Sequence, residues 1–207
     1  MIEIQGMTTG PVEANCYFIY NDEAMIIVDP GEDADRIKAK VEEIGRKPVG
    51  ILLTHTHYDH IGALEEIRQT YDIPVAVHPL EQAWLQDDKL NLSGLRPMES
   101  IVCQPAEVEL EEKTYDMGGM RFEVLYTPGH SHGGVSFVFP EAEFVVTGDA
   151  LFAGSVGRTD LPTGNMDTLL TGIQTKLFTL PEHYTIYPGH RGSSTIGFEM
   201  AHNPFFN

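Results

Sequence analysis

The strongest constraint on this chain is a dense run of histidines that directly follows an apolar segment. Residues 54–62 read THTHYDHIG, which places three imidazoles and one carboxylate within six residues. Neutral imidazole and carboxylate are ligands that suit zinc and neighbouring first-row metals. Isolated histidines are common in solvated loops, whereas this spacing is typical of a metal-binding loop. The run therefore predicts a metal centre at the end of a buried strand.

The spacing within the run predicts how its ligands divide. Side chains of an extended chain alternate with period two, so His55, His57 and Asp59 would point one way. We expect a helix to begin near Ile61, and the turn into that helix would carry His60 to the other side. One short loop could then serve two neighbouring metals.

Three further side chains of the metal-binding type follow a common pattern of β-rich segment, glycine and ligand. The stretches 122–126, 144–147 and 184–187 each lead into Gly or Pro-Gly. Glycine lets the backbone turn tightly at low steric cost, and the ends of strands hold side chains in fixed geometry. The side chains presented in this way are His130, Asp149 and His190.

These motifs resemble those of the metallo-β-lactamase-fold hydrolases, and within them the short bacterial members of the glyoxalase II-like (hydroxyacylglutathione hydrolase-like) branch. The matching segments are THTHYDHIG at 54–62, TPGHS at 127–131, GDALF at 148–152, GSVGRTD at 154–160 and PGH at 188–190. The endings TIG at 195–197 and HNPF at 202–205 also resemble that branch. The resemblance covers nearly the whole chain, with the motifs in the expected order.

The resemblance implies a fold, a domain count and a set of ligands. The fold would be α/β, a four-layer αββα sandwich, with residues 1–207 forming a single metallo-β-lactamase-like domain. Two divalent metal ions would be bound, with zinc expected first and iron or manganese as alternatives, because availability decides among these ions at His/Asp sites. One metal would be held by His55, His57 and His130, the other by Asp59, His60 and His190, with Asp149 bridging the two.

Hydrophobic patterning predicts strands and helices in alternation along the chain. Strands are expected at 15–20 and 25–28, joined by a turn at Asn21-Asp22, and again at 49–53, 75–77 and several places within 101–146. Helices are expected at 33–44, ended by Gly45, and at 64–71, 80–86 and 166–178. This order fits several mixed α/β layer arrangements, and the resemblance selects the sandwich among them.

Several residues outside the motifs are expected to have structural rather than functional roles. Trp84, together with Leu80 and Leu85, is expected to pack a helix rather than to form a platform for substrate. His183 and His202 have no motif around them, so we expect both to be structural or solvated.

Composition limits the functions that the chain can serve. Its net charge of −18 repels polyanions, and no Lys/Arg cluster supports nucleic-acid binding. No apolar run is long enough to span a membrane, and the N-terminus shows no signal peptide. Cys16 and Cys103 are expected to be two buried, reduced thiols, which favours a cytoplasmic location.

Two closely spaced metals favour a hydrolytic reaction. A water that bridges them loses its proton near neutral pH, and one metal can polarise the substrate carbonyl. Asp149 would fix the metal spacing and Asp59 would hold the hydroxide in line, so we expect both to be catalytic. The motifs contain no additional acid, which favours a thiolate over an amine as the leaving group. The leading hypothesis is a dinuclear hydrolase that cleaves a 2-hydroxyacyl thioester such as lactoylglutathione.

The sequence indicates less about the thiol part of the substrate than about the type of reaction. Longer glyoxalase II enzymes carry a C-terminal helical extension with basic contacts to glutathione, whereas this chain ends at Asn207 without one. Arg158 is expected either to bind a substrate carboxylate or to pair with Asp160, since arginine suits both roles. Arg191 follows a predicted ligand and either steers an anionic substrate or serves the surface. His132 is expected to be a loop residue beside the ligands.

Three other classes of function are weaker. Persulfide dioxygenases share the fold and a GRTD-type motif but bind a single iron, so a complete second ligand set ending in His190 favours the hydrolase. β-Lactam hydrolysis is disfavoured because no export signal is visible. A non-enzymatic binding module would leave seven ligand-type side chains without a task.

Overall fold

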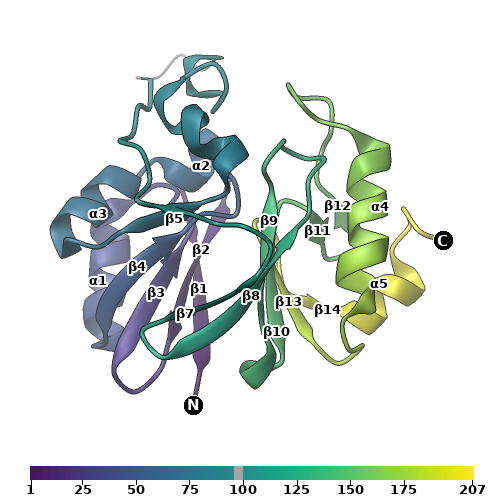
Figure 1. The fold of residues 1–207 in the computed structure, drawn as a ribbon, viewed down its shortest axis with the longest axis horizontal. Coiled ribbons are helices and arrows are strands. Elements are labelled where there is room, and N and C mark those ends of the chain that lie inside the picture. Colours follow the sequence, from purple (N-terminus) through teal and green to yellow (C-terminus); the bar gives the residue numbers. More distant parts are fainter. Residues whose placement is uncertain (96–99) are drawn as a thin grey trace. The chain divides into compact units, whose positions relative to one another are not determined.

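A computed structural model of the chain describes residues 1–95 and 100–207 and separates them into two compact units. The first unit holds Met1–Leu110 with Asp116–Met120, and the second holds Glu111–Tyr115 with Arg121–Asn207. Each unit contains a six-stranded sheet with helices lying against it (Figure 1).

The sheet of the first unit follows the order of the sequence. Its strands are β1 (Glu3–Thr9), β2 (Ala14–Tyr20), β3 (Ala24–Val28), β4 (Lys47–Leu52), β5 (Val75–Val77) and β6 (Val108–Glu109). Strands β1 to β3 pair antiparallel, and β3 to β6 pair parallel. The predicted turn at Asn21 is confirmed, because its side-chain oxygen accepts the backbone N–H groups of Glu23 and Ala24 at 2.9 and 2.8 Å.

Helices α1 (Ala34–Ile44) and α3 (Leu64–Tyr71) lie beside this sheet (Figure 1). Both were expected from the sequence, and α1 ends as predicted at Gly45, whose φ of 68° suits glycine. Ile37 of α1 and Ile67 of α3 are fully buried and belong to one apolar cluster with strand residues such as Ile27. Burial of such side chains contributes about 1.5–3 kcal/mol each, so these faces fix the helices on the sheet.

One expectation about the first unit is wrong, and another is confirmed with a different helix type. The helix predicted to begin near Ile61 begins earlier, because α2 (Tyr58–Ile61) already contains Asp59 and His60. Asp59 therefore lies on a helical turn and not at the end of an extended stretch. The helix expected at 80–86 is a 3₁₀ helix, η1 (Pro79–Gln86), in which Trp84 and Leu85 are buried and Leu80 is 41 % exposed.

The other six-stranded sheet, which belongs to the second unit except for residues 116–117 and 120, is mixed in direction. Its order is β14 (Ser194–Thr195), β13 (Thr185–Pro188), β10 (Phe144–Gly148), β9 (Val135–Phe139), β8 (Met120–Tyr126) and β7 (Thr114–Met117). Strand β10 pairs parallel with β13 and antiparallel with β9, which pairs antiparallel with β8. A small hairpin joins β11 (Leu151–Phe152) to β12 (Ser155–Val156).

Helices α4 (Met166–Lys176) and α5 (Ile196–His202) lie beside this second sheet (Figure 1). Helix α4 was expected at 166–178, and its last residues form a separate 3₁₀ turn, η4 (Leu177–Thr179). The buried Leu169 and Ile173 of α4 share an apolar cluster with Val145 and Ile186 of the sheet. Within residues 1–95 and 100–207, no helix is long and apolar enough to cross a membrane.

The two cysteines are buried free thiols, as predicted. Burial raises the pKa of Cys103 to about 12, and burial also raises the pKa of Cys16 well above its ordinary value. At pH 8 a thiol with that pKa is ionised on the order of once in ten thousand molecules, and only the thiolate reacts. We expect neither cysteine to react with iodoacetamide in the native protein at pH 8, and both to react in denaturant. Mass spectrometry of the native protein would contradict this if it showed stoichiometric labelling.

Candidate functional site

The first unit brings its predicted ligands to one edge of its sheet. Asp29 follows β3, and His55 and His57 follow β4, which runs parallel to β3. The carboxyl ends of parallel strands meet at the same edge, which is where functional side chains gather in α/β sheets. The Asp29 backbone N–H donates to Leu52 O at 3.1 Å and keeps the two strand ends in register.

Asp29 holds the metal loop, defined here as residues 54–60, through hydrogen bonds. It is 2 % exposed, and its Oδ1 accepts the backbone N–H of Thr54 at 2.8 Å. Its Oδ2 accepts the Thr54 hydroxyl at 2.5 Å and lies 3.0 Å from His60 Nδ1. A carboxylate only accepts, so His60 Nδ1 carries the proton and Nε2 keeps the lone pair with which a histidine binds a metal.

The same hydrogen-bonded chain orients His55. The Thr54 hydroxyl donates a hydrogen bond to Asp29, so the hydroxyl oxygen accepts a hydrogen bond from His55 Nδ1 at 3.1 Å. This arrangement again leaves the lone pair on Nε2. Ligand-type atoms of the buried Asp29, His55 and His60 all lie within 4.8 Å of one another, and His60 Nε2 is 3.6 Å from an oxygen of Asp59. A buried set of two imidazoles and carboxylates fits a divalent cation.

Sequence reasoning missed Asp29 and also Glu81, a second buried carboxylate that holds the loop. Glu81 is fully buried, and its Oε2 accepts both the backbone N–H and the hydroxyl of Thr56, at 3.0 and 2.6 Å. Asp29 had a visible signal, because it stands between the apolar β3 and Pro30-Gly31, at a strand end near glycine like the other ligands, although here the glycine follows the ligand. Glu81 had no such signal, because a single acidic residue in an acid-rich sequence is expected to lie on the surface.

The second unit also gathers its predicted ligands at one sheet edge. Asp149 follows β10, and His190 follows β13, which is parallel to β10. Strand β8, which precedes His130, runs in the same direction because two antiparallel pairings separate it from β10. His130 Nε2 and His190 Nε2 lie 3.4 and 3.6 Å from Asp149 Oδ2. Asp149 Oδ2 thus faces both imidazoles. This arrangement fits a carboxylate that is shared by the two ligand groups to which His130 and His190 are predicted to belong.

The loop that carries His130 is shaped by glycine and by the N-terminus of α4. Gly129 has a φ of 125°, and a Cβ there would lie 2.5 Å from the Leu169 backbone nitrogen, so only glycine fits. Gly129 O accepts the backbone N–H of Asn165, the cap of α4, at 2.8 Å. His130 Nδ1 donates to Arg158 O at 2.8 Å, which directs the lone pair of Nε2 toward Asp149.

The two arginines expected at the substrate lie on exposed loops. Arg158 pairs with Asp160 through two contacts of 2.7 Å, and this pairing lowers the pKa of Asp160 to about 2. The side chains are 62 % and 68 % exposed. Arg191 is exposed with a φ of 69°, and His132 is exposed with its backbone oxygen accepting the Tyr126 hydroxyl at 2.8 Å. Binding of substrate by either arginine stays a prediction.

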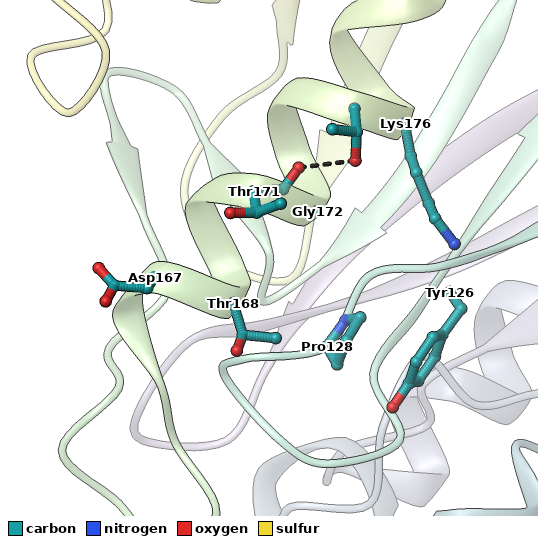
Figure 2. Close-up of a pocket in the computed structure, with 8 residues that line it drawn as sticks. Tyr126, Pro128, Asp167, Thr168, Thr171, Gly172 and Lys176 are labelled. Carbon is teal, nitrogen blue, oxygen red and sulfur yellow. Dashed lines mark hydrogen bonds between the residues drawn. The ribbon is translucent and has the colours of Figure 1, made fainter.

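A groove of about 410 Å³ runs between α4 and the strand end that leads to His130 (Figure 2). Tyr126 and Pro128 form one wall, and the other is a helical face with threonine hydroxyls. Lys176 stands at its end, with Nζ paired to Glu112 and 5.6 Å from the centre of the Tyr126 ring. The charge of Lys176 is thus engaged within the protein, and the groove offers mainly apolar and hydroxyl surface. The helical face is formed by Thr168, Thr171, Gly172 and Thr175, with Asp167 at its start.

A third buried carboxylate ties the C-terminal helix to the loop that carries Arg158. Glu199 is fully buried and accepts the Gly154 backbone N–H at 2.9 Å and the Ser194 hydroxyl at 2.5 Å. It also accepts from Asn203 Nδ2 at 2.8 Å, and the same amide donates to Ser155 O. The motif at 202–205 therefore helps to attach the segment that begins at Gly154 to α5.

The predicted ligands divide between the two units. His55, His57, Asp59 and His60 come together in the first unit, and His130, Asp149 and His190 in the second. Their assignment to two shared metals stays a prediction. His183 lies apart from these groups, with Nε2 3.4 Å from Glu143 on the surface, and His202 Nδ1 contacts Phe198 O within α5.

The matching family model and the similar proteins indicate the same family. The family model described as "Metallo-beta-lactamase superfamily" matches residues 9–190. "Probable metallo-hydrolase M6_Spy0554" of Streptococcus pyogenes serotype M6 is 50 % identical over 198 residues, 93 % of this chain and 85 % of that protein. "Hydroxyacylglutathione hydrolase GloC" of Haemophilus influenzae is 34 % identical over 199 residues, 94 % of this chain and 93 % of that protein.

Solved structures agree with the sequence matches. The crystal structure of BLEG-1 B3 metallo-beta-lactamase has a TM-score of 0.96 and 40 % identity, covering 99 % of both chains. The crystal structure of TTHA1623 in a di-iron-bound form has a TM-score of 0.86 and 36 % identity, covering 97 % of this chain and 99 % of that chain. These likenesses confirm the predicted fold class.

Proposed function

The chain belongs to the metallo-beta-lactamase superfamily, and from that membership we propose that it is a dinuclear metal-dependent hydrolase of acyl thioesters. The relatives support the broader statement of a metallo-hydrolase. The thioester proposal is supported by the 34 % identity to a protein named as a hydroxyacylglutathione hydrolase. Since one family model spans residues of both units, we further propose that residues 1–207 act as one domain.

The proposed ligands are those that each unit gathers at its sheet edge. We propose that His55, His57 and His130 hold one metal, that Asp59, His60 and His190 hold the other, and that Asp149 bridges them. The observation that carries the proposal is the fixed tautomer of His55, His60 and His130, each of which donates through Nδ1 and keeps Nε2 for a ligand bond. All three histidines are buried, unlike His202, whose Nδ1 also donates to a carbonyl but which lies on the surface.

The metals supply Lewis acidity and an ionised water when they are bound. Zinc is the proposed ion, with iron or manganese as alternatives, and the di-iron form of TTHA1623 shows that a related chain accepts iron. The free thiols support a cytoplasmic location, because thiols persist in reducing compartments.

The residues of the chain supply orientation and proton handling. We propose that Asp59, which lies on the helical turn α2, would accept a proton from the attacking water and keep that water in line. We propose that Asp149, whose Oδ2 lies 3.4 and 3.6 Å from the Nε2 atoms of His130 and His190, fixes the spacing of these imidazoles. A thiolate is a weak base and leaves without a strong proton donor, which matches a ligand set without an additional acid. Arg158 and Arg191 are proposed to attract an anionic acyl thioester.

β-Lactam hydrolysis is the second candidate, and the 40 % identity to BLEG-1 B3 metallo-beta-lactamase favours it. The two candidates share the attacking group and differ in the leaving group. A β-lactam nitrogen needs a proton as the ring opens, whereas a thiolate does not. Because the motifs that carry the ligands contain no additional acid, we expect the protein to cleave thioesters faster than β-lactams.

The experiment that tests the proposal compares purified protein on three classes of substrate. Thiol release is measured from lactoylglutathione and other acyl thiols, ring opening from a β-lactam, and oxygen uptake from a persulfide. We expect thiol release that chelation removes and that His130→Ala abolishes, while the matched control His183→Ala keeps wild-type rates. Oxygen uptake on the persulfide without thiol release would replace the hydrolase by a dioxygenase, and faster ring opening would select the β-lactam candidate.

Substitution of Arg158 tests the proposed substrate contact without disturbing the fold. Its pair with Asp160 is exposed, and solvent screens such pairs, so Arg158→Ala should leave the melting temperature unchanged. The lowered pKa of Asp160 keeps the pair intact above about pH 3, and the pair is lost only as pH falls toward 2. We expect Arg158→Ala to raise KM for an anionic thioester several-fold. Wild-type kinetics would remove Arg158 from the substrate site.

A further inference from the structure

We propose that the segment from Pro79 to Asn91 is a positioning element that holds residues 56–58 of the metal loop through Glu81, Trp84 and Asn91, and that Trp84 reports metal binding at His57. The proposal rests on the proposed function only in that His57 binds a metal. The three contacts fall on three consecutive residues of the loop.

The first contact fixes Thr56. Glu81 of η1 is fully buried, and one of its oxygens accepts both the backbone N–H and the hydroxyl of Thr56, at 3.0 and 2.6 Å. Thr56 stands between His55 and His57, so holding its backbone and its side chain sets the direction in which both flanking imidazoles leave the chain. Hydrogen bonds to a charged acceptor are stronger than those between neutral groups, so this pair of contacts restrains the loop.

The second contact fixes His57. Trp84 stacks on its imidazole with ring centroids 6.1 Å apart and planes inclined by 28°. Residues three apart share a face of a 3₁₀ helix, so Glu81 and Trp84 project from the same side of η1. Trp84 is 5 % exposed, which prevents its ring from swinging away into solvent.

The third contact fixes Tyr58, the first residue of α2. Its backbone N–H donates to Asn91 O at 2.8 Å. Asn91 is fully buried, and its Nδ2 donates to Trp84 O at 3.2 Å and to Ile101 O at 2.9 Å. Asn91 therefore joins the start of α2 to the C-terminal part of η1.

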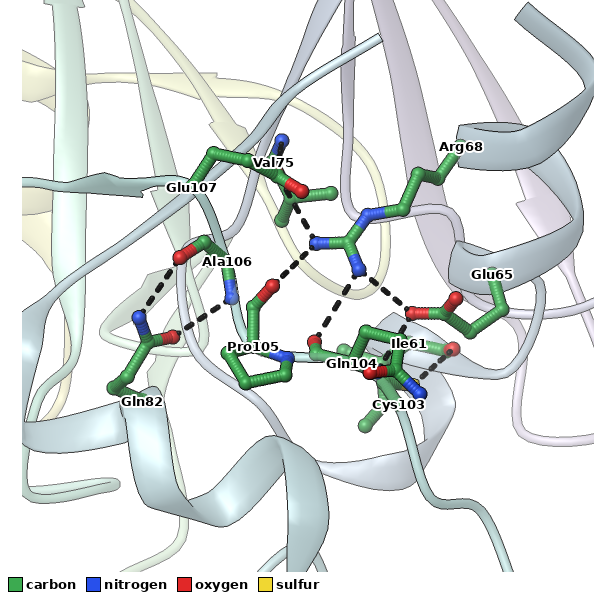
Figure 3. A network of polar contacts seen from close by, with 10 residues as sticks. All are labelled: Ile61, Glu65, Arg68, Val75, Gln82, Cys103, Gln104, Pro105, Ala106 and Glu107. Atoms are coloured by element: carbon green, nitrogen blue, oxygen red, sulfur yellow. Dashed lines mark hydrogen bonds and ion pairs between the residues drawn. The ribbon is translucent and has the colours of Figure 1, made fainter. Parts of the chain in front are cut away.

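Helix η1 is also anchored through Gln82 to the segment that contains Ala106 (Figure 3). The Gln82 side chain and the Ala106 backbone exchange two hydrogen bonds of 2.9 Å. Arg68 of α3 in turn donates to Pro105 O at 3.0 Å and pairs with Glu65 at 3.0 Å. Because η1 is held on both sides, the loop geometry is set before a metal arrives, and binding does not have to order the loop.

The first arm of the test uses the wild-type protein. Trp84 is the single tryptophan of the chain, so tryptophan-selective emission reports this position alone. A divalent cation on the stacked imidazole changes the electric field at the indole. Zinc titration of metal-free protein should change the emission, and the change should be complete at about one metal per chain even though loading continues to about two. Trp84→Phe keeps an aromatic ring against His57 and should lose the signal while binding zinc as well as wild type.

The second arm measures zinc affinity by competition with a chromogenic chelator. Glu81→Ala should weaken zinc binding about 10–100-fold, as loss of an outer partner of a metal ligand does. Glu81→Gln keeps an acceptor oxygen and should bind within a few-fold of wild type. The matched control is Glu66→Ala, since Glu66 is an exposed acid of the same unit that pairs with Lys38 at 2.7 Å and should leave zinc affinity unchanged.

The outcomes separate this inference from the proposed function. Zinc loading without any change in Trp84 emission would overturn the reporter, and wild-type affinity in Glu81→Ala would overturn the positioning role. If Glu81→Ala does not fold, Thr56→Val removes the shorter hydrogen bond and decides the same question. Metal binding with the expected emission change but no thioesterase activity would overturn the function alone. A wild-type protein that binds no metal would overturn both.

Discussion

Asp29→Asn is expected to lower the metal affinity of the protein about 10–100-fold and to lower thiol release in parallel. Asp29 offers two acceptor oxygens to three donors, namely the Thr54 backbone N–H, the Thr54 hydroxyl and His60 Nδ1. Asparagine keeps the size and tolerates the φ of 49° at this position, but one acceptor becomes an NH₂ that faces a donor. The proton on His60 Nδ1 or the position of Thr54 then changes, and with it the ligand geometry.

Chelator competition and thiol release at saturating zinc measure the two consequences of this substitution. At saturating metal the activity of Asp29→Asn should recover in part, because the defect lies in holding the metal loop. Asp33→Asn is the matched control, since Asp33 also accepts a backbone N–H, from Gly10 at 3.0 Å, and has no contact with the loop. Equal affinities in Asp29→Asn and wild type would show that Asp29 does not orient the ligands.

Glu199→Ala is expected to reduce the free energy of unfolding by about 3 kcal/mol or more. The substitution removes the acceptor of three hydrogen bonds inside the second unit, from Gly154, Ser194 and Asn203. Each buried donor left without an acceptor costs about 1–3 kcal/mol, and the cavity adds to the loss. The segment that begins at Gly154 would also lose its attachment to α5.

Urea denaturation measures this loss, with Glu199→Gln as the conservative variant. Gln keeps one acceptor oxygen and should lose less than Glu199→Ala. Glu141→Ala, a substitution at an exposed acid of the same unit, should change the free energy of unfolding by about 0.5 kcal/mol or less. A Glu199→Ala variant as stable as wild type would mean that water takes the place of the lost carboxylate.

Much of the fold was predictable because strands and ligands follow a simple alternation along the chain. The stretch before Thr54 is apolar and β-rich, and it becomes β4; the stretch before Asp149 becomes β10 in the same way. Parallel pairing of the strands then gathers the side chains that follow them at one edge. Helix α1 was predictable from the spacing of Ile37 and Val41 and from the glycine that ends it.

The parts that escaped prediction have physical reasons. The alternating His-x-His-x-Asp pattern suggested an extended chain through Asp59, but backbone hydrogen bonding turns the chain into α2 from Tyr58 onward. Glu81 and Glu199 are fully buried because each satisfies backbone and side-chain donors from distant segments, which local sequence does not show. In a chain with 31 acidic residues, two buried carboxylates do not stand out.

The most direct test of the central claim is the metal content of the purified protein, measured per chain by elemental analysis before and after chelation and reloading. We predict about two divalent ions per chain, with thioester hydrolysis lost on chelation and restored on reloading. A protein that retains full thioester hydrolysis with no bound metal, or that binds a single iron and cleaves no thioester, would contradict this prediction.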